Sequence, residues 1–375
     1  MEGSGGSGCL LPKNLGGDSM KKVIAILVVF ALIAGAAFAD TWMGGGFRAG
    51  WNVISNSGEE DAESTTNIGI EDTSFNIGGQ SEDGVIGGNI RIRGWHNDSF
   101  SDWEWGGFGG SHFFAWWKPV PQVKVFLGRN PDGDFGYDGF VGWGFHEGGN
   151  DYGAIHGYDY GNGHAGGFSA LGFYLALTPI DGLEIDFALP LSTEAELLED
   201  AFKTVYIQAS YDISGIGKAF FTYNGLGYVE DVNNGDIGFG FHLNAIEGIP
   251  VILLAKIGLP DGGDGDFGLS LGAAYYAGDF GVKFRVATTF KSDKDADFGI
   301  NLNVMPFYNF GFMKGFLNLG FHVVNEDTSL FYLNPYIMKW IGGGTLSAGI
   351  QVDIWNNDGD STTSFNLPIK IGYSF

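Results

Sequence analysis

The C-terminal segment of this chain places the strongest constraint on its fold. From residue 365 to residue 375 (FNLPIKIGYSF), apolar side chains alternate with polar or small ones up to the last residue. A period of two residues is typical of a β-strand, because successive side chains point to opposite faces. Such a strand fits a position with lipid on one side and a polar lumen on the other. An edge strand of a soluble β-sandwich is the alternative.

Alternating segments of this kind fill most of the sequence after residue 40, and each is predicted to be a β-strand. None of this part contains the roughly 18 consecutive apolar residues that a membrane-spanning helix needs. About 18 strands are predicted, an even number as single-chain bacterial barrels require, and 16 is the alternative count. The predicted strands are 41–55, 66–79, 83–97, 110–118, 121–128, 168–178, 182–191, 203–213, 216–225, 235–246, 249–259, 266–277, 279–291, 296–308, 312–324, 328–339, 344–355 and 363–375.

The connections between the predicted strands fall into two classes. Every second connection is short and rich in turn-forming residues, as at 178–182 and 278–279. The other connections carry clusters of acidic residues, as at 194–200 and 261–266. Short turns at one membrane face and longer loops at the other are typical of membrane barrels, which must close because an open edge would leave backbone groups unpaired in lipid. The sequence therefore predicts an all-β, closed antiparallel transmembrane barrel with both termini in the periplasm.

Composition narrows the classes of protein further. Aromatic residues make up 15% of the chain, which argues against disorder, and 65 glycines suit strands that must curve. A formal net charge of −25 argues against nucleic acid as a partner. The single cysteine, Cys9, precedes the predicted mature chain, so no disulfide framework or thiol chemistry is expected there.

The N-terminal part resembles an export signal. A short basic start at 20–22 precedes an apolar core at 23–36, and small residues follow at the positions before a cleavage site. We therefore predict a signal peptide at 20–39, export by the general secretory route and a single barrel domain at 40–375.

Residues 1–19 fit neither the signal nor the barrel. Residues 15–18 (LGGD) can be encoded by a stretch that contains a ribosome-binding sequence just before the Met20 codon. We interpret 1–19 as translated upstream sequence that is not native to the protein, and we expect synthesis to begin at Met20.

Basic residues within the predicted strands indicate which face is the lumen. In 279–291, Lys283 and Arg285 share one face, and apolar side chains fill the other. A Lys or Arg on the lipid face near the membrane midplane would cost about 2–4 kcal/mol, so the basic face must be the inner one. The predicted pore-lining basic residues are Arg48, Arg91, Arg93, Lys124, Arg129, Lys283 and Arg285.

A final strand that alternates in this way and ends in an aromatic residue resembles the assembly signal of bacterial outer-membrane β-barrels. Tyr373 and Phe375 carry this resemblance. It implies insertion by the barrel assembly machinery into the outer-membrane lipid of a diderm bacterium.

The chain also resembles the general-diffusion porins, and its overall sequence pattern is similar to that of spirochaete-type porins. In that family the fifth strand ends in Gly-Arg and leads into a long loop that folds into the barrel and narrows it. Here the fifth predicted strand ends in Gly128-Arg129, and an insertion follows at 130–167. The sequence departs from the family in lacking the Pro-Glu-Phe-Gly-Gly loop core and in mapping to more strands than the family's sixteen.

The porin resemblance implies passive diffusion of small hydrophilic solutes, an inward constriction loop and a homotrimer. The implied loop carboxylates, six in number, outnumber the five bases on the wall formed by the first, third and fifth predicted strands (Arg48, Arg91, Arg93, Lys124 and Arg129), so a mild cation preference is predicted that weakens as salt rises. These carboxylates are Asp132, Asp134, Asp138, Glu147, Asp151 and Asp159.

Two other functions stay open, and several chemistries do not fit. A substrate-selective sugar channel would use a tryptophan cluster, and a surface adhesin or structural barrel would use the acidic loops. We expect neither enzymatic activity nor a cofactor, because no plausible nucleophile–base pair stands out. No metal site is expected either, since the loop histidines are too widely spaced for a compact ligand motif. The residues concerned are Trp103, Trp105, Trp116 and Trp117, and His146, His156 and His164.

Overall fold

Antiparallel strands make up most of the chain that the computed structural model describes, which is residues 40–58, 63–96, 105–129, 171–190, 205–224, 228–229, 232–233, 235–259, 267–290, 299–323 and 327–374. The first part contains β1 (Asp40–Asn56), β2 (Thr65–Gln80), β3 (Ile86–His96), β4 (Trp105–Val120), β5 (Val123–Arg129), β6 (Leu171–Ile180), β7 (Leu183–Pro190), β8 (Tyr206–Ile213) and β9 (Gly217–Asn224). A short separate hairpin follows, formed by β10 (Tyr228–Val229) and β11 (Val232–Asn233).

The second part contains β12 (Gly235–Leu243), β13 (Val251–Leu259), β14 (Phe267–Ala277), β15 (Phe280–Phe290), β16 (Gly299–Asn309), β17 (Lys314–Val323), β18 (Thr328–Ile341), β19 (Gly344–Gly349), β20 (Gln351–Asn357) and β21 (Asp360–Ser374). The described ranges contain no helix that is long and apolar enough to cross a membrane.

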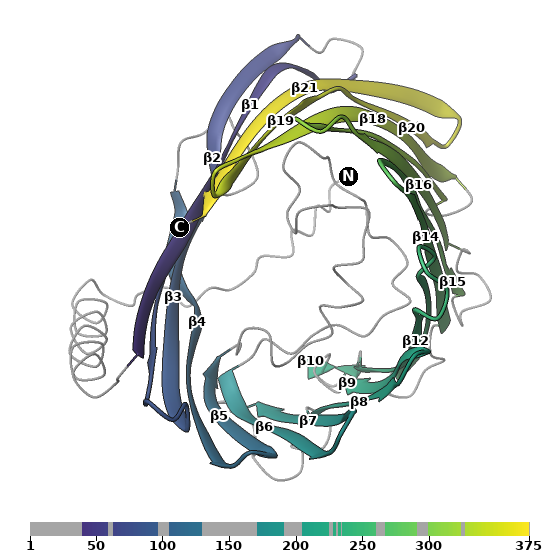
Figure 1. The fold of residues 1–375 in the computed structure, drawn as a ribbon. Coiled ribbons are helices and arrows are strands. Elements are labelled where there is room, and N and C mark those ends of the chain that lie inside the picture. The colour runs from purple at the N-terminus through teal and green to yellow at the C-terminus, as the bar shows by residue number, and fades with distance from the viewer. Residues whose placement is uncertain are drawn as a thin grey trace, which may run out of the picture.

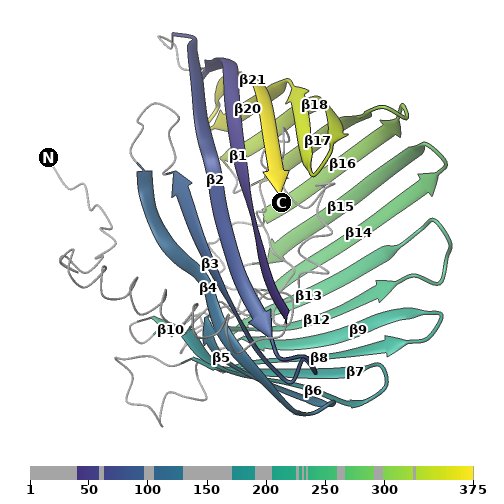
Figure 2. The ribbon, with the colours of Figure 1, turned by 60° about the vertical axis from the view of Figure 1, so that its left-hand side comes forward.

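The main sheet closes on itself. Its strands pair antiparallel with their neighbours along the chain, and β1 pairs with both β2 and β21, so the first and last strands share a seam. Figure 1 shows the resulting ring along its axis, and Figure 2 shows β1 beside β21 from the side. Closure pairs both edges of each strand in this sheet, which strands inside a hydrocarbon layer require because they have no water to bond.

Strands β19 and β20 are two parts of one strand. Both pair with β18 on one side and β21 on the other. The register across from β18 is the same on both sides of the break, with Tyr336 opposite Gly349 and Leu333 opposite Val352. Counted once, β19 and β20 give a closed barrel of 18 strands, which confirms the predicted number.

The interruption of this strand at Ile350 has a chemical cause. The N–H of Ile350 donates to the carbonyl oxygen of Pro335 on β18 at 2.9 Å. Pro335 has no N–H to return a bond to Ile350. The side-chain amide of Asn334 donates to the Ile350 carbonyl oxygen instead, at 2.6 Å. A side chain therefore replaces one backbone bond of the ladder, and the register survives.

Short turns gather at one end of the barrel. Asp40, the first described residue, pairs there with Gln80, beside the turn that leads into β3. Two of the turns contain Gly182 and Gly278 with φ of 81° and 62°, a left-handed conformation that glycine adopts without strain. The turns lie at 81–85, 121–122, 181–182, 214–216, 244–250, 278–279, 310–313 and 342–343. This end matches the one predicted to be periplasmic.

The strands separate polar from apolar side chains. Along β18, Tyr332 and Asn334 are fully buried on the inner face, whereas Phe331 and Ile337 are 39% and 47% exposed on the outer face. Large apolar side chains continue this outer surface around the barrel, among them Leu253, Leu269, Phe321 and Ile371. An exposed apolar surface of this extent is stable in lipid and not in water. Each segment predicted to be a strand contains an observed strand, which confirms the predicted all-β, closed antiparallel barrel.

Candidate functional site

Two of the predicted basic residues lie on the inner face of β15. The register places Arg285 opposite Asn303 of β16, whose side chain is buried, and Lys283 opposite the buried Met305. The guanidinium Nε of Arg285 donates to the Ser270 hydroxyl oxygen on β14 at 3.4 Å. Serine is neutral, so this bond orients the guanidinium without cancelling its charge.

Two more predicted cations lie on the inner face of the first strands. Arg91 of β3 is opposite Asn76 of β2. Lys124 of β5 places its ammonium 4.3 Å from the ring centroid of Phe126 and 5.3 Å from that of Trp116. Aromatic faces attract cations, so these rings hold the lysine against the wall. The influence of all four cations on ion flow stays a prediction.

The other predicted bases are placed by their backbone alone. Arg48 lies opposite Gly372 across the seam, Arg93 lies opposite Ser74, and Arg129 ends β5 opposite Leu171. Just before Arg129, Gly128 has φ of 141°, and an added Cβ would lie 2.1 Å from the Phe113 carbonyl oxygen, so glycine is required there.

The predicted constriction lies outside the described residues. This applies to the insertion at 130–167, to its six acidic residues and to the three loop histidines. Phe375 is also outside, whereas Tyr373 is described and lies on the outer face, 43% exposed. The inward loop and its charges therefore stay predictions.

Amide side chains form an unpredicted surface on the inner face of β16–β21, which we call the amide wall. In one register row Asn318 lies opposite Asn334, and Gln351 lies opposite Asn366. In the next row the Tyr332 hydroxyl donates to Asn303, and Asp353 accepts from Gln351. Asn318 is fully buried, with its amide oxygen and nitrogen unpaired within the described part. Asparagine at alternate positions of these strands is the signal from which this wall could have been found.

Aromatic side chains form a second surface on the inner face of β1–β6, which we call the aromatic wall. The rings of Trp42, Trp116, Phe114 and Phe126 follow one another with centroid separations of 6.2, 5.9 and 6.0 Å. Phe126 packs further against the buried Tyr174. Rings at this spacing attract one another through their edges and faces, and they make one continuous surface.

Inward-facing glycines lie beneath these rings. A Cβ at Gly78 would lie 2.3 Å from the indole of Trp42, and a Cβ at Gly87 would lie 2.1 Å from that of Trp116. The same arrangement recurs elsewhere on the inner face, where rings cover Gly240, Gly281 and Gly320. Each ring therefore rests on a neighbouring strand instead of standing up into the lumen.

The tryptophan cluster predicted for a sugar track divides between the two faces. Trp116 belongs to the inner face, but Trp117 is on the outer face and 52% exposed. That part of the prediction is wrong, because adjacent residues of a strand point to opposite sides. The side chains of Trp103 and Trp105 lie outside the described part. The inner partner of Trp116 is Trp42, which sequence reasoning missed.

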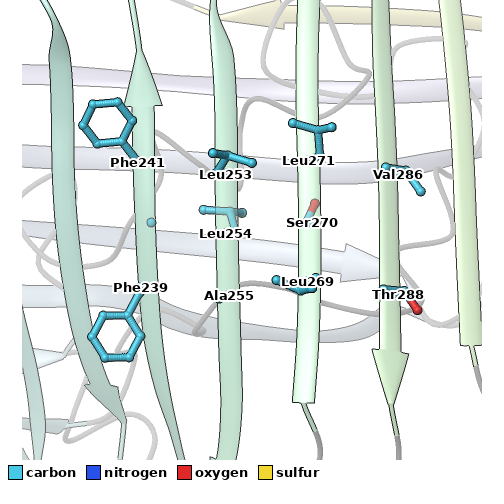
Figure 3. A pocket seen from close by; sticks show the side chains of 11 residues that line it. Phe239, Phe241, Leu253, Leu254, Ala255, Leu269, Ser270, Leu271, Val286 and Thr288 are labelled. Carbon is cyan, nitrogen blue, oxygen red and sulfur yellow. The ribbon is translucent and has the colours of Figure 1, made fainter.

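The outer face carries a groove of about 630 Å³ on β12–β15. Figure 3 shows the side chains around it, including Phe239, Leu253, Leu269 and Thr288. Ala255, a small residue among large ones, leaves the space. Because the groove opens to the lipid side, it is separate from the lumen walls.

In the described ranges, no group of three or more His, Cys, Asp or Glu residues could hold a metal ion.

Comparison with known proteins identifies the fold. Neither a protein-family model nor a curated protein sequence matches the chain. Among solved structures, OpdL of Pseudomonas aeruginosa matches with a TM-score of 0.55 and 13% identity over 90% of this chain and 99% of that one. OccAB4 of Acinetobacter baumannii matches with a TM-score of 0.53 and 9% identity over 90% and 98%. The fold is that of bacterial outer-membrane porins.

A mutant of the Rhodopseudomonas blastica porin also aligns, with a TM-score of 0.48 and 15% identity over 90% of this chain and 100% of that one. At identities this low, the likeness extends to the barrel and not to the solute. The inner walls of this chain must therefore be interpreted from their own residues.

Proposed function

We propose that this protein is an outer-membrane channel through which small hydrophilic solutes and ions diffuse passively. The observation that carries the proposal is the closed barrel with an apolar outer face and an inner face of amides, hydroxyls and cations. An inner face of this kind is stable against water, and water in the lumen gives polar solutes a path through the lipid.

Conductance measures this function directly. The purified, folded protein added to a planar lipid bilayer should produce discrete, long-lived steps of current that grow with salt concentration. Folded barrels that insert without conducting would contradict the channel and favour the adhesin, whose acidic loops would then be the functional surface.

A substrate-selective channel is the second candidate, and the aromatic wall favours it. General diffusion does not require a continuous aromatic surface in the lumen, whereas a substrate-selective channel can use such a surface to bind its solute. The two candidates differ in one measurement, because a selective channel shows a current block that saturates with solute concentration.

The proposed function also includes partners. These are the outer-membrane lipid, the barrel assembly machinery and two further copies of the chain in a trimer.

A further inference from the structure

The aromatic wall contains a platform formed by Trp42 of β1 and Trp116 of β4. The two indoles reach toward each other across β2 and β3, with centroids 6.2 Å apart and planes inclined by 25°. Gly78 and Gly87 lie directly beneath them. Trp42 is 39% exposed, and Trp116 is partly exposed. A nearly flat, accessible aromatic surface therefore lies on the lumen wall near the turn end of the barrel.

Polar atoms without partners lie at the edge of this platform. Asn89 is opposite Gly78 in the register, and Asn76 is opposite Arg91 one row farther from the turns. The amide oxygens of Asn76 and Asn89 and the Nε of Arg91 are buried and have no hydrogen-bond partner in the described part of the chain. Buried polar atoms without partners cost free energy. The side chains that carry these three atoms are partly exposed, so a small rotation of each would bring them to a ligand in the lumen that pairs with them.

The required ligand chemistry follows from these groups. Two of the unpaired atoms are acceptors and one is a donor. A carboxylate would pair with the guanidinium but would leave both amide oxygens unpaired, because it accepts and does not donate. A hydroxyl donates and accepts, so neighbouring hydroxyls on one molecule can satisfy all three atoms.

The platform adds a second requirement, which is an apolar face. A pyranose ring presents C–H groups on its face and hydroxyls around its edge, whereas an open-chain polyol has no such fixed face. We propose that Trp42 and Trp116 stack against a neutral sugar ring whose edge hydroxyls bond to Asn76, Asn89 and Arg91. This site rests on the proposed channel function, since a solute reaches it through the lumen.

The surroundings of the platform limit where the ring can lie. The Lys124 ammonium is 5.3 Å from the Trp116 centroid and closer to Phe126, so it occupies the β5 side of the surface. The open side is toward Trp42 and the strands that carry the amides. A bound sugar therefore lies over β2 and β3, directly above the two glycines.

Current block by sugars tests this site. Single channels in planar bilayers should be blocked saturably by maltose, whereas sorbitol at the same concentration should only lower the conductance of the bulk solution. Trp42→Ala and Trp116→Ala should each weaken the maltose block about tenfold, by analogy with the loss of one aromatic ring from a site that stacks a nucleobase. Asn89→Ala should weaken it less, and Gly87→Ala should weaken it by displacing the Trp116 ring.

Phe220→Ala is the matched control, because this ring also covers an inner glycine, Gly240, but lies on β9 away from the platform. It should leave the maltose block unchanged. Conducting channels that maltose and sorbitol affect alike would overturn the sugar site and leave the channel function intact. If the folded protein does not conduct, titrating its tryptophan fluorescence with maltose in detergent still decides the site, and a saturable change lost in Trp116→Ala supports it. Absence of a saturable change overturns it.

Discussion

The aromatic wall and the amide wall are built on the same alternating strands, yet they present different chemistry to the lumen. On the aromatic wall, Trp42 and Trp116 lie over glycines, with Lys124 held against the rings. On the amide wall, Asn318 and Asn334 occupy the equivalent inner positions. The outer face is apolar over both walls because lipid requires it. Lipid therefore dictates the chemistry of one face of each strand, whereas the other face is available for recognition.

The largest expected effect concerns the seam at which the two walls meet. Phe375 is the last residue of the predicted assembly signal and directly follows β21, the strand that pairs with β1. Deleting Phe375, or changing it to Ser, removes this residue. Both walls depend on this pairing, so the amount of folded barrel in the outer membrane should fall sharply. Surface labelling and gel mobility of unheated samples measure it. Normal levels of either variant would contradict the assembly signal.

The next effect compares an inner ring with an outer one on the same strand. Phe316 is buried, and its ring stacks on Tyr336 with a centroid separation of 4.6 Å and an angle of 9°. Phe316→Ala should lower the free energy of unfolding by about 3–5 kcal/mol, as is usual for emptying a packed aromatic site. Phe321→Ala, at an outer position that is 41% exposed, should cost clearly less. Urea unfolding in lipid vesicles measures both, and equal losses would contradict the assignment of packing to the inner face.

Ion preference should depend on the arginines of the aromatic wall and not on the asparagines of the amide wall. Changing Arg91 and Arg93 together to Ala should strengthen the preference for cations, whereas Asp134 and Asp138 changed to Asn should weaken or reverse it. The shift in permeability ratio should shrink between 0.1 M and 1 M salt, because the Debye length falls from about 10 Å to about 3 Å.

The matched control for these charge changes is the double variant Asn318→Ala and Asn334→Ala, which alters the amide wall without changing its charge. Its reversal potential should equal that of the unmodified protein. If neither charged pair moves the reversal potential, the insertion at 130–167 does not form the narrowest part of the path.

The smallest effect lies in a turn of the aromatic wall. The Ser81 hydroxyl donates to Asp83 at 2.6 Å and lowers the pKa of this carboxyl below its usual value, and the Val85 N–H adds to the effect. A pKa that is lower in the folded state stabilises the fold above the ordinary carboxyl pKa, and the contribution is lost as pH falls through the lowered value. Ser81→Ala should therefore cost slightly more stability at pH 7 than at pH 2, where only the bonds between the Ser81 hydroxyl and the Ile86 backbone are lost.

The corresponding turn of the amide wall, at 342–343, is Gly-Gly and has no carboxylate. Changing Gly343 to Ala there should leave the pH dependence unaltered, whatever it does to stability. Thermal unfolding at both pH values measures this difference. A Ser81→Ala variant with the same loss at pH 2 as at pH 7 would show that the hydroxyl acts on the turn and not on the charge.

The barrel was predictable because its main signal is local. Alternation, turn residues and the direction of basic side chains can be interpreted one strand at a time, and they led to the right strand number. The break at Ile350 was not predictable in this way, since its cause, Pro335, lies on the neighbouring strand. The register between two strands decides whether a proline and an amide on one strand lie opposite a given residue of the next. The sequence of one strand alone does not specify this register.

The inner walls were only partly predictable for a related reason. Arg91, Lys124, Lys283 and Arg285 could be assigned because a charge in lipid costs several kcal/mol. Placing an amide in lipid costs less free energy than placing a charge there, so the asparagines did not indicate which face is the lumen. The amide wall was therefore missed. The pairing of Trp42 with Trp116 depends on the glycines of two intervening strands. Loop placement, trimer formation and the absence of enzymatic activity stay predictions.

The glycines beneath the rings have a consequence for engineering the bore of this barrel. A ring that rests on a glycine takes up little of the cross-section, and one added methyl group at Gly78, Gly87 or Gly320 would lift it away from the backbone. Each such position would change how far one ring extends into the lumen, at a different place around the circumference. A set of single substitutions would then yield a graded series of apertures from one scaffold, with the outer surface left unchanged.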